Sequence, residues 1–247
     1  MNYSLLKFPR KSHRKIINIP KKSKELAELF GIIFGDGGIN NEWQLVISLD
    51  SNVDLEYSYF VRELLEKLFK IEVAVRKRPN QNTLVLVCSS IDLVDFLVKK
   101  GSVRGNKIVQ QIDIPNWINS NSEYKKAFVR GLVDTDGCLF IHKHITKNVL
   151  CNNIGFCFTN SCKKLIISMA RIFKEFGINP HIADKGRRIY LYSFKDVVSY
   201  LNIFGSSNPR IFKKYLQWIN IKKYRDDNIV KNIILLSNRI WKGAGAV

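Results

Sequence analysis

The chain has 247 residues, of which 46% are hydrophobic and 25% charged, a composition that can build a core and excludes a wholly disordered basic protein. Its 40 Lys and Arg against 21 Asp and Glu leave a net charge of +19, which favours a polyanion as the partner. The sequence has neither an apolar run of the roughly 18–20 residues that cross a bilayer nor the apolar stretch of a secretory signal. We therefore expect a soluble intracellular protein without a membrane partner, in the cytoplasm or, alternatively, in an organellar matrix.

The chain opens with a basic extension, residues 1–24, which holds eight Lys and Arg and no acid. This extension is interpreted either as an arm that follows DNA phosphates or as a basic targeting segment. A first half, residues 25–113, follows and begins with ELAELFGIIFGDG, which predicts a helix. Hydrophobic spacing then predicts a strand at 44–49, a helix at 53–69, strands at 73–77 and 84–88, and a helix at 93–100.

The second half repeats this order of elements. The stretch IPNWINSNS, residues 114–122, is the expected linker, and the second half covers residues 123–218. After a helix that contains VRGLVDTDG, the patterns predict strands at 138–143 and 154–158, a helix at 163–176, strands at 181–183 and 189–192, and a helix at 196–204. A second basic extension, residues 219–247, is expected to contain one more helix. The order αββαββα in each half predicts a duplicated α+β fold.

The similarity between the halves is strongest in the first helix of each. Alignment of FGIIFGDG with RGLVDTDG places Asp36 and Asp136 100 residues apart. In these helices Gly31 and Gly35 share one face, as Gly131 and Thr135 do, and small residues at this spacing let two helix backbones approach closely. We therefore expect the two motif helices to pack against each other through these small residues.

Each motif helix ends in Asp-Gly, and Gly37 and Gly137 are suited to the left-handed residue that closes a helix. A carboxylate at a helix C-terminus faces the negative end of the helix dipole, and two such carboxylates would repel each other. A divalent cation removes this conflict when it is bound by Asp36, Asp136 and the last carbonyls of the helices, those of Gly35 and Thr135. Oxygen ligands favour Mg²⁺, with Mn²⁺ as the alternative. In a basic protein this arrangement favours metal-assisted phosphodiester hydrolysis.

The segments LFGIIFGDG and VRGLVDTDG resemble the two copies of the motif that names the LAGLIDADG homing endonucleases, and the resemblance covers residues 25–218. It implies a single-chain, monomeric enzyme whose two halves form a saddle, with β-sheets in the major groove of a long, asymmetric DNA target. It also implies that Asp36 and Asp136 are the catalytic, metal-binding acids and that Asp134 is structural.

The resemblance further implies one basic residue after the last helix of each half and a polar residue that orients water at the end of the second strand. Lys107 matches the basic position in the first half and Lys213 in the second, with Arg210 and Lys214 as alternatives. Asn160 matches the polar position in the second half. The first half has Leu49 and Asp50 there instead, which predicts unequal cleavage of the two strands.

Strand alternation separates a core face from a face toward DNA. We expect Trp43, Leu45, Ile47 and Leu49 to point inward. We expect base or phosphate contacts from the outward side chains, although plain surface exposure is an equal alternative for each of them. These are Asn40, Glu42, Gln44, Ser48, Arg76, Arg78, His142, His144, Asn153, Arg187 and Arg188.

The sequence predicts a site-specific double-strand DNA endonuclease. Met1 and Val247 do not supply the groups that protein splicing uses, so we expect a free-standing protein encoded in an intron. An RNA maturase that binds intron RNA and a DNA-binding regulator that does not cleave are the alternatives on the same scaffold.

Overall fold

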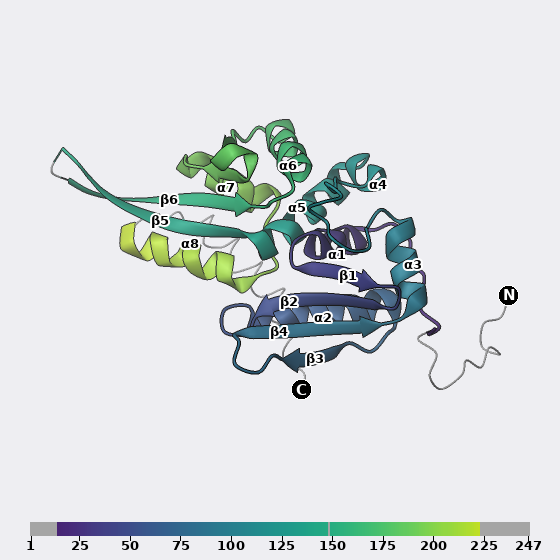
Figure 1. Cartoon of the computed structure of the whole chain (residues 1–247). Coiled ribbons are helices and arrows are strands. Elements are labelled where there is room, and N and C mark those ends of the chain that lie inside the picture. The colour runs from purple at the N-terminus through teal and green to yellow at the C-terminus, as the bar shows by residue number, and fades with distance from the viewer. Residues whose placement is uncertain (1–13, 148, 223–247) are drawn as a thin grey trace.

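The computed structural model describes residues 14–147 and 149–222, which form two similar halves, each with one four-stranded antiparallel sheet (Figure 1). The first sheet has the order β1-β2-β4-β3, with bounds β1 (Gly37–Asn41), β2 (Gln44–Asp50), β3 (Ala74–Lys77) and β4 (Thr83–Ser89). The second sheet has the order β5-β6-β8-β7, with bounds β5 (Gly137–Thr146), β6 (Val149–Thr159), β7 (His181–Ala183) and β8 (Arg188–Leu191). The equal strand order confirms the predicted duplicated α+β fold.

The helices follow the predicted order, with one additional short helix and with a last helix that begins earlier than expected. The bounds are α1 (Lys24–Phe34), α2 (Leu55–Phe69), α3 (Ile91–Lys99), α4 (Asn116–Asn119), α5 (Ser122–Asp136), α6 (Lys163–Glu175), α7 (Phe194–Ile203) and α8 (Pro209–Lys222). The short helix α4 lies inside the stretch expected to be a linker. The helix α8 begins within the second half, nine residues before Trp218, because Ile211, Tyr215 and Trp218 bury their side chains in the core. Residues 1–13 and 223–247 of the two basic extensions lie outside the described residues.

The helices α1 and α5 lie side by side between the two sheets (Figure 1). A Cβ atom at Gly31 would overlap the carbonyl oxygen of Phe128, and one at Gly131 would overlap that of Glu28. A Cβ atom at Gly35 would overlap the side chain of Thr135. The seam between the halves is therefore a contact of one backbone with another, which only glycine permits at these positions.

Gly37 and Gly137 differ from the prediction that they close the helices in a left-handed conformation. Neither has a positive φ, and both begin a strand. The space around them requires glycine instead, because a Cβ atom would lie 2.5 Å from the Cα of Ile33 in the first half and 2.7 Å from the carbonyl oxygen of Val133 in the second. The strand turns back so closely along its own helix that a side chain does not fit.

The strand faces agree with the alternation except near the first hairpin. Leu45, Ile47 and Leu49 are buried, but Trp43 is 38% exposed, so its inward assignment is wrong. The pairing of β1 with β2 shifts register between Gly38 and Asn41, and the residues between the two strands form a turn. Trp43 lies in this turn, where strand alternation does not apply.

The second sheet has a longer first hairpin, which extends away from the rest of the molecule (Figure 1). Its strands pair from Gly137 with Phe158 to Thr146 with Val149. The helix α8 contacts β5 and β6, and the indole Nε1 of Trp218 donates to the carbonyl oxygen of Asn152 (2.9 Å). Within the described part of the chain no helix is long and apolar enough to cross a membrane.

Candidate active site

Asp36 and Asp136 lie at the same end of the seam between α1 and α5. Asp136 is the last residue of α5, and Asp36 follows the end of α1 by two residues. Both side chains are half-buried, and burial raises the pKa of Asp36 to about 7 and that of Asp136 to about 6, from an ordinary value of 3.8. The nearby charge of Asp136 adds to the rise at Asp36. The seam thus brings two carboxylates together where two helix dipoles are negative.

Asn160, directly after β6, holds the carboxylate of Asp136. Its Nδ2 donates to Asp136 Oδ2 (2.7 Å), and its Oδ1 accepts from the backbone N–H of Cys162 (2.8 Å). The second bond fixes which way the amide points. Asp136 and Asn160 line a cavity of about 250 Å³ together with Gly35 and Lys107.

Lys107 closes the same cavity from the first half and covers the C-terminal end of α1. Its Nζ donates to the carbonyl oxygens of Ile33 (2.9 Å), Phe34 (2.9 Å), Gly35 (2.6 Å) and Gly37 (2.5 Å). A cation is favourable at this end of a helix dipole. Burial lowers the pKa of Lys107, whereas the charges of the two motif acids act in the opposite direction.

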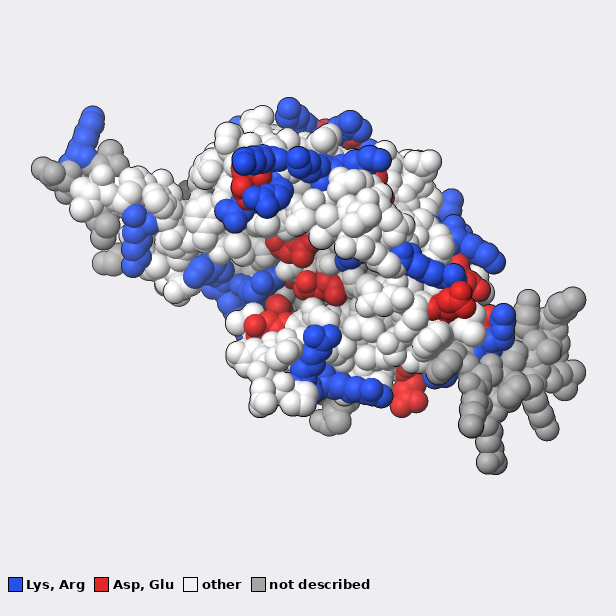
Figure 2. Space-filling model, in the orientation of Figure 1, with Lys and Arg blue, Asp and Glu red and all other residues white. Residues whose placement is uncertain are grey.

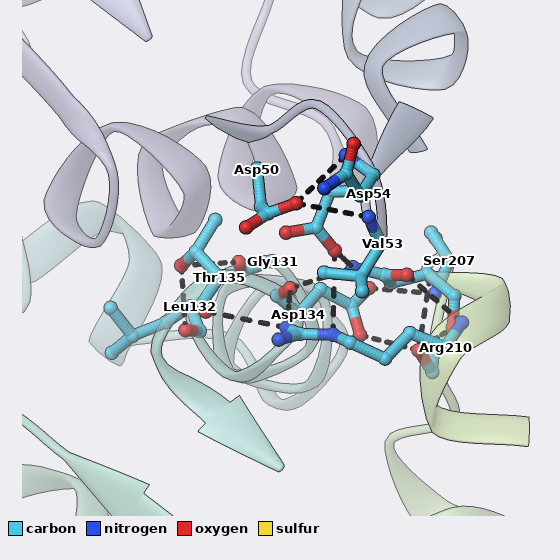
Figure 3. A network of polar contacts seen from close by, with 12 residues as sticks. Asp50, Val53, Asp54, Gly131, Leu132, Asp134, Thr135, Ser207 and Arg210 are labelled. Atoms are coloured by element: carbon cyan, nitrogen blue, oxygen red, sulfur yellow. Dashed lines mark hydrogen bonds and ion pairs between the residues drawn. The ribbon is translucent and has the colours of Figure 1, made fainter. Parts of the chain in front are cut away.

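The first half has no counterpart of Asn160. The register of β2 against β1 matches that of β6 against β5 and places Leu49, which is buried, at the equivalent position. Asp50 instead closes a turn by accepting from the backbone N–H groups of Asn52 (2.8 Å) and Val53 (3.0 Å; Figure 3). Among the residues that the structure describes, no group donates a hydrogen bond to the carboxylate of Asp36. The surroundings of the two acids are therefore unequal.

Arg210 contacts the last carbonyl oxygens of α5, as Lys107 contacts those of α1. Figure 3 shows Arg210 beside Asp134 and Asp54. Its Nη2 donates to the carbonyl oxygens of Asp134 (2.8 Å) and Thr135 (3.4 Å), and its Nε lies 3.3 Å from Asp54 Oδ1. The positive charge of Arg210 lowers the pKa of both motif acids, against the effect of burial.

The sequence predicts Lys213 as the basic residue near the acids in the second half, but the structure places its side chain elsewhere. Its Nζ lies 2.9 Å from Glu56 Oε1, and its side chain is 64% exposed and lines a hollow of about 570 Å³. Arg210, one of the alternatives, lies in the first turn of α8, directly after Pro209. Proline favours the first position of a helix, so the Pro209–Arg210 pair was the signal that could have separated the two candidates.

A buried polar network that the sequence did not reveal joins the two halves. Glu28 on α1 and Arg130 on α5 form an ion pair (2.6 Å), and Ser207 Oγ donates to Glu28 Oε1 (2.5 Å). Asn208 Nδ2 donates to Asp54 Oδ1 in the first half (2.7 Å) and to the carbonyl oxygen of Asp134 in the second (3.0 Å).

Asp134 is fully buried in this network. Its carboxylate accepts from the hydroxyl of Ser206 and from the backbone N–H of Ser207 (2.7 Å). Burial nevertheless raises the pKa of Asp134 to about 7. Its partners belong to the loop before α8, which is consistent with the structural role that the resemblance implies.

The predicted DNA contacts lie on strand faces and in turns. Gln44, Ser48 and Arg76 share one face of the first sheet, because Ser48 and Arg76 both pair with Val85 and Gln44 lies four residues from Ser48. Asn40 is exposed on β1. Arg78 directly follows β3, before the turn that leads to β4, and Glu42 is exposed in the first hairpin turn, within 3.9 Å of Arg104.

In the second sheet His142 pairs with Asn153, and the rings of His142 and His144 stack at 5.1 Å on the same face. Arg188 begins β8 and Arg187 precedes it in a turn, both near Asp184 (3.5 Å and 3.0 Å). One view of the molecular surface shows acidic side chains in a row near the middle of the face, with Lys and Arg on both sides (Figure 2).

The residues present fit a divalent cation in part. Two half-buried carboxylates with raised pKa values, one of them without a hydrogen-bond donor among the described residues, offer the hard oxygen ligands that Mg²⁺ prefers. No group of three or more His, Cys, Asp or Glu side chains suited to a metal occurs in residues 14–147 and 149–222. Further ligands would have to be carbonyl oxygens, water or phosphate, and Lys107 already occupies the carbonyl of Gly35.

Comparisons with known proteins identify the fold. Residues 123–217 match the family model of the LAGLIDADG-like domain, whereas no curated protein matches the chain. The structure of the I-LtrWI LAGLIDADG homing endonuclease bound to target DNA is similar over 88% of this chain and 98% of its own, at 12% identity and a TM-score of 0.54. I-DmoI in complex with DNA and Mn is similar over 74% of this chain and 97% of its own, at 18% identity and a TM-score of 0.50.

Full-length DUF199/WhiA from Thermatoga maritima is similar over 90% of this chain and 70% of its own, at 18% identity and a TM-score of 0.51. Identities this low relate folds and not activities. The second half of the chain is therefore similar to the LAGLIDADG-like domain, and both halves together have the fold of the solved LAGLIDADG homing endonucleases.

Proposed function

We propose that the protein is a homing endonuclease, intron-encoded and acting as a monomer, which hydrolyses both strands of a long, asymmetric DNA target with Mg²⁺ or Mn²⁺. The observation that carries this proposal is the pair of carboxylates, Asp36 and Asp136, at one end of a glycine seam inside a basic protein. The deciding experiment incubates the protein and Mg²⁺ with a plasmid that carries the uninterrupted insertion site. Binding without cutting or nicking would contradict the proposal.

Each side chain of the site has a proposed task. Asp36 and Asp136 would hold the cations, and a bound cation would polarise the phosphodiester and activate water. Asn160 would orient Asp136 and water at one scissile phosphate. Lys107 and Arg210 would supply positive charge near the phosphates, one in each half. The strand faces would position the duplex through phosphate and base contacts.

Replacement of Asn160 should affect one DNA strand more than the other. Asn160→Leu gives the second half the residue that the first half already has, and it removes the donor 2.7 Å from Asp136. A hydrogen bond to a charged group contributes about 1.5–3 kcal/mol, so we expect one strand to be cut about 10–100-fold more slowly. A duplex labelled on each strand in turn and resolved on a denaturing gel measures both rates. The control is Asn119→Leu on the surface of α4; an equal loss on both strands would refute the asymmetry.

The cleavage rate should rise with pH, and the pH at which it rises should depend on the concentration of the metal. Both motif acids have raised pKa values, about 7 and about 6, and only their ionised forms bind a cation. Single-turnover rates should therefore increase from about pH 5.5 to 7.5, and more Mg²⁺ should shift the midpoint to lower pH.

The two motif acids also predict how the stability of the metal-free protein changes with pH. Because the folded pKa values are raised, the metal-free fold prefers neutral acids and loses stability as the pH rises from about 4 to 7. Mg²⁺ should then raise the melting temperature at pH 8 but not at pH 5.5. Equal stabilisation at both values would contradict metal binding at these acids.

A second candidate is a DNA-binding protein that does not cleave. The contact that favours it is the ammonium group of Lys107 on the carbonyl of Gly35, an oxygen expected to face the metal. This candidate predicts DNA affinity that does not depend on Mg²⁺ and no product on any strand. The maturase alternative predicts instead that intron RNA competes with the DNA target for binding.

A further inference from the structure

Two cysteines face each other on the second sheet, next to the candidate active site. Cys138 is the second residue of β5, and it pairs directly with Cys157 on β6. The next pair outward on the same face is Phe140 with Gly155, whereas the intervening Leu139 is buried on the core face. Both thiols therefore point to the strand face proposed to meet DNA, and both are free, with Cys138 exposed and Cys157 half-buried.

The register alone brings these thiols within bonding range. Directly opposite residues in an antiparallel pair have Cα atoms about 4.5 or 5.5 Å apart, and both separations fall inside the range of about 4.4–6.8 Å found for disulfides. The other cysteines lack this geometry, because Cys88 and Cys162 are buried in the core and Cys151 pairs with His144.

The surroundings make the two thiols unequal. The neighbouring thiol of Cys138, the hydroxyl of Thr159 (3.6 Å) and the charge of Arg188 lower the pKa of Cys157 to about 6, against the effect of burial. The thiolate is the reactive form of cysteine. Cys157 is therefore the side chain that would attack first, and Cys138 is the partner placed to complete the reaction.

We propose that Cys138 and Cys157 are an oxidant-sensitive thiol pair that closes to a disulfide across the DNA-facing sheet when the protein meets a low-molecular-weight disulfide. The Cys157 thiolate attacks one sulfur of oxidised glutathione, the small disulfide bond breaks, and one glutathione thiolate leaves. Cys138 then attacks the Cys157 sulfur of the mixed disulfide, and the second glutathione leaves with the proton from Cys138. Two protein thiols are oxidised and one small disulfide is reduced to two thiols.

Closure would act on the site through the chain next to it. Cys138 lies two residues after Asp136, and Cys157 lies three residues before Asn160. A disulfide draws opposite Cβ atoms from about 4.5–5.5 Å to about 3.8 Å. The strand β5, which directly follows Asp136, and the strand β6, which directly precedes Asn160, must then shift, and this changes the 2.7 Å contact between Asn160 and Asp136. This consequence rests on the proposed function: the oxidised protein should cut one strand more slowly than the reduced protein, and the other strand should be unaffected.

The test of the thiol pair does not need cleavage. The full-length protein is incubated with oxidised glutathione, and its mass and linked peptides are measured. The expected product has lost two hydrogen atoms, contains a peptide that links Cys138 to Cys157, and reverts with dithiothreitol. Cys138→Ser should stop at glutathione bound to Cys157, and Cys151→Ser should still form the link. A link to another cysteine, or no link while glutathione accumulates at Cys151, would overturn the proposal.

Strand-resolved cleavage separates this proposal from the proposed function. If both redox forms fail to cut while the link forms, the nuclease assignment fails and the thiol pair stands. If the link forms and the oxidised protein cuts both strands as fast as the reduced protein does, the coupling to Asp136 is overturned. If the reduced protein cuts and no link forms, the thiol pair fails alone.

Discussion

Asp136→Asn should abolish double-strand cleavage while leaving DNA binding intact. The amide keeps the shape of the carboxylate at the end of α5 but removes the charge that would hold a cation. A bound cation contributes several kcal/mol to the stabilisation of charge in such a reaction, and each 1.4 kcal/mol is a factor of ten, so we expect a loss of about a thousandfold. The conversion of supercoiled plasmid to linear product measures it.

The control makes the same Asp-to-Asn substitution at a carboxylate on the surface. Asp92 lies in the first turn of α3 and forms an ion pair with Arg14 (3.3 Å). The Asp92→Asn variant should cleave DNA at the rate of the unchanged protein. DNA affinity of Asp136→Asn, measured in Ca²⁺ or without metal, should be equal or slightly higher, because one negative charge is removed near the phosphates. Cleavage that persists together with weaker binding would show that Asp136 is not a catalytic acid.

Gly131→Val should disrupt the seam and destabilise the whole protein. A Cβ atom at this position would overlap the carbonyl oxygen of Glu28, which belongs to the backbone of the facing helix and cannot rotate away. Overpacking in a core costs about 1–3 kcal/mol or more, and two helix backbones must separate here, so we expect about 3 kcal/mol. For a chain of this size that corresponds to a melting temperature lower by about 10 °C.

Gly38→Ala is the matched control for this substitution. A Cβ atom at Gly38 would meet only the Asn40 Oδ1 atom at 4.0 Å, and the backbone there does not have a positive φ. Its melting temperature should therefore stay close to that of the unchanged protein. A similar loss in both variants would show that glycine is needed for flexibility in these segments and not for the close approach of α1 and α5.

The sequence alone predicted much of the fold because the relevant signals are local. The helices and strands follow hydrophobic periods of 3.6 and two residues, and these periods repeat in both halves. The likeness of LFGIIFGDG to VRGLVDTDG was sufficient to predict the two motif helices and the two acids at their ends. Local periodicity failed at Trp43, which lies in the hairpin turn between β1 and β2 and not on a strand.

The candidate site required contacts between segments far apart in the chain. Lys213 and Arg210 are only three residues apart, and both are basic, so composition does not separate them. The structure separates them because the guanidinium of Arg210 reaches the carbonyl oxygens of α5 and Asp54 together, whereas Lys213 pairs with Glu56 at the surface. The planar guanidinium can serve several acceptors at once, which an ammonium group on a flexible stem does less well.

The sequence by itself determined the duplicated fold, the glycine seam and the two acids, since each is encoded in a contiguous segment. The resemblance also named Lys107 and Asn160 as candidates. Only the tertiary structure decided the contacts around the acids: the carbonyl oxygens at the end of α1 that Lys107 reaches, Arg210 in place of Lys213 at the end of α5, the hydrogen bond from Asn160 to Asp136, and the facing thiols of Cys138 and Cys157. Burial and hydrogen bonding at a site depend on which segments fold together, and these set the charge and pKa of its groups.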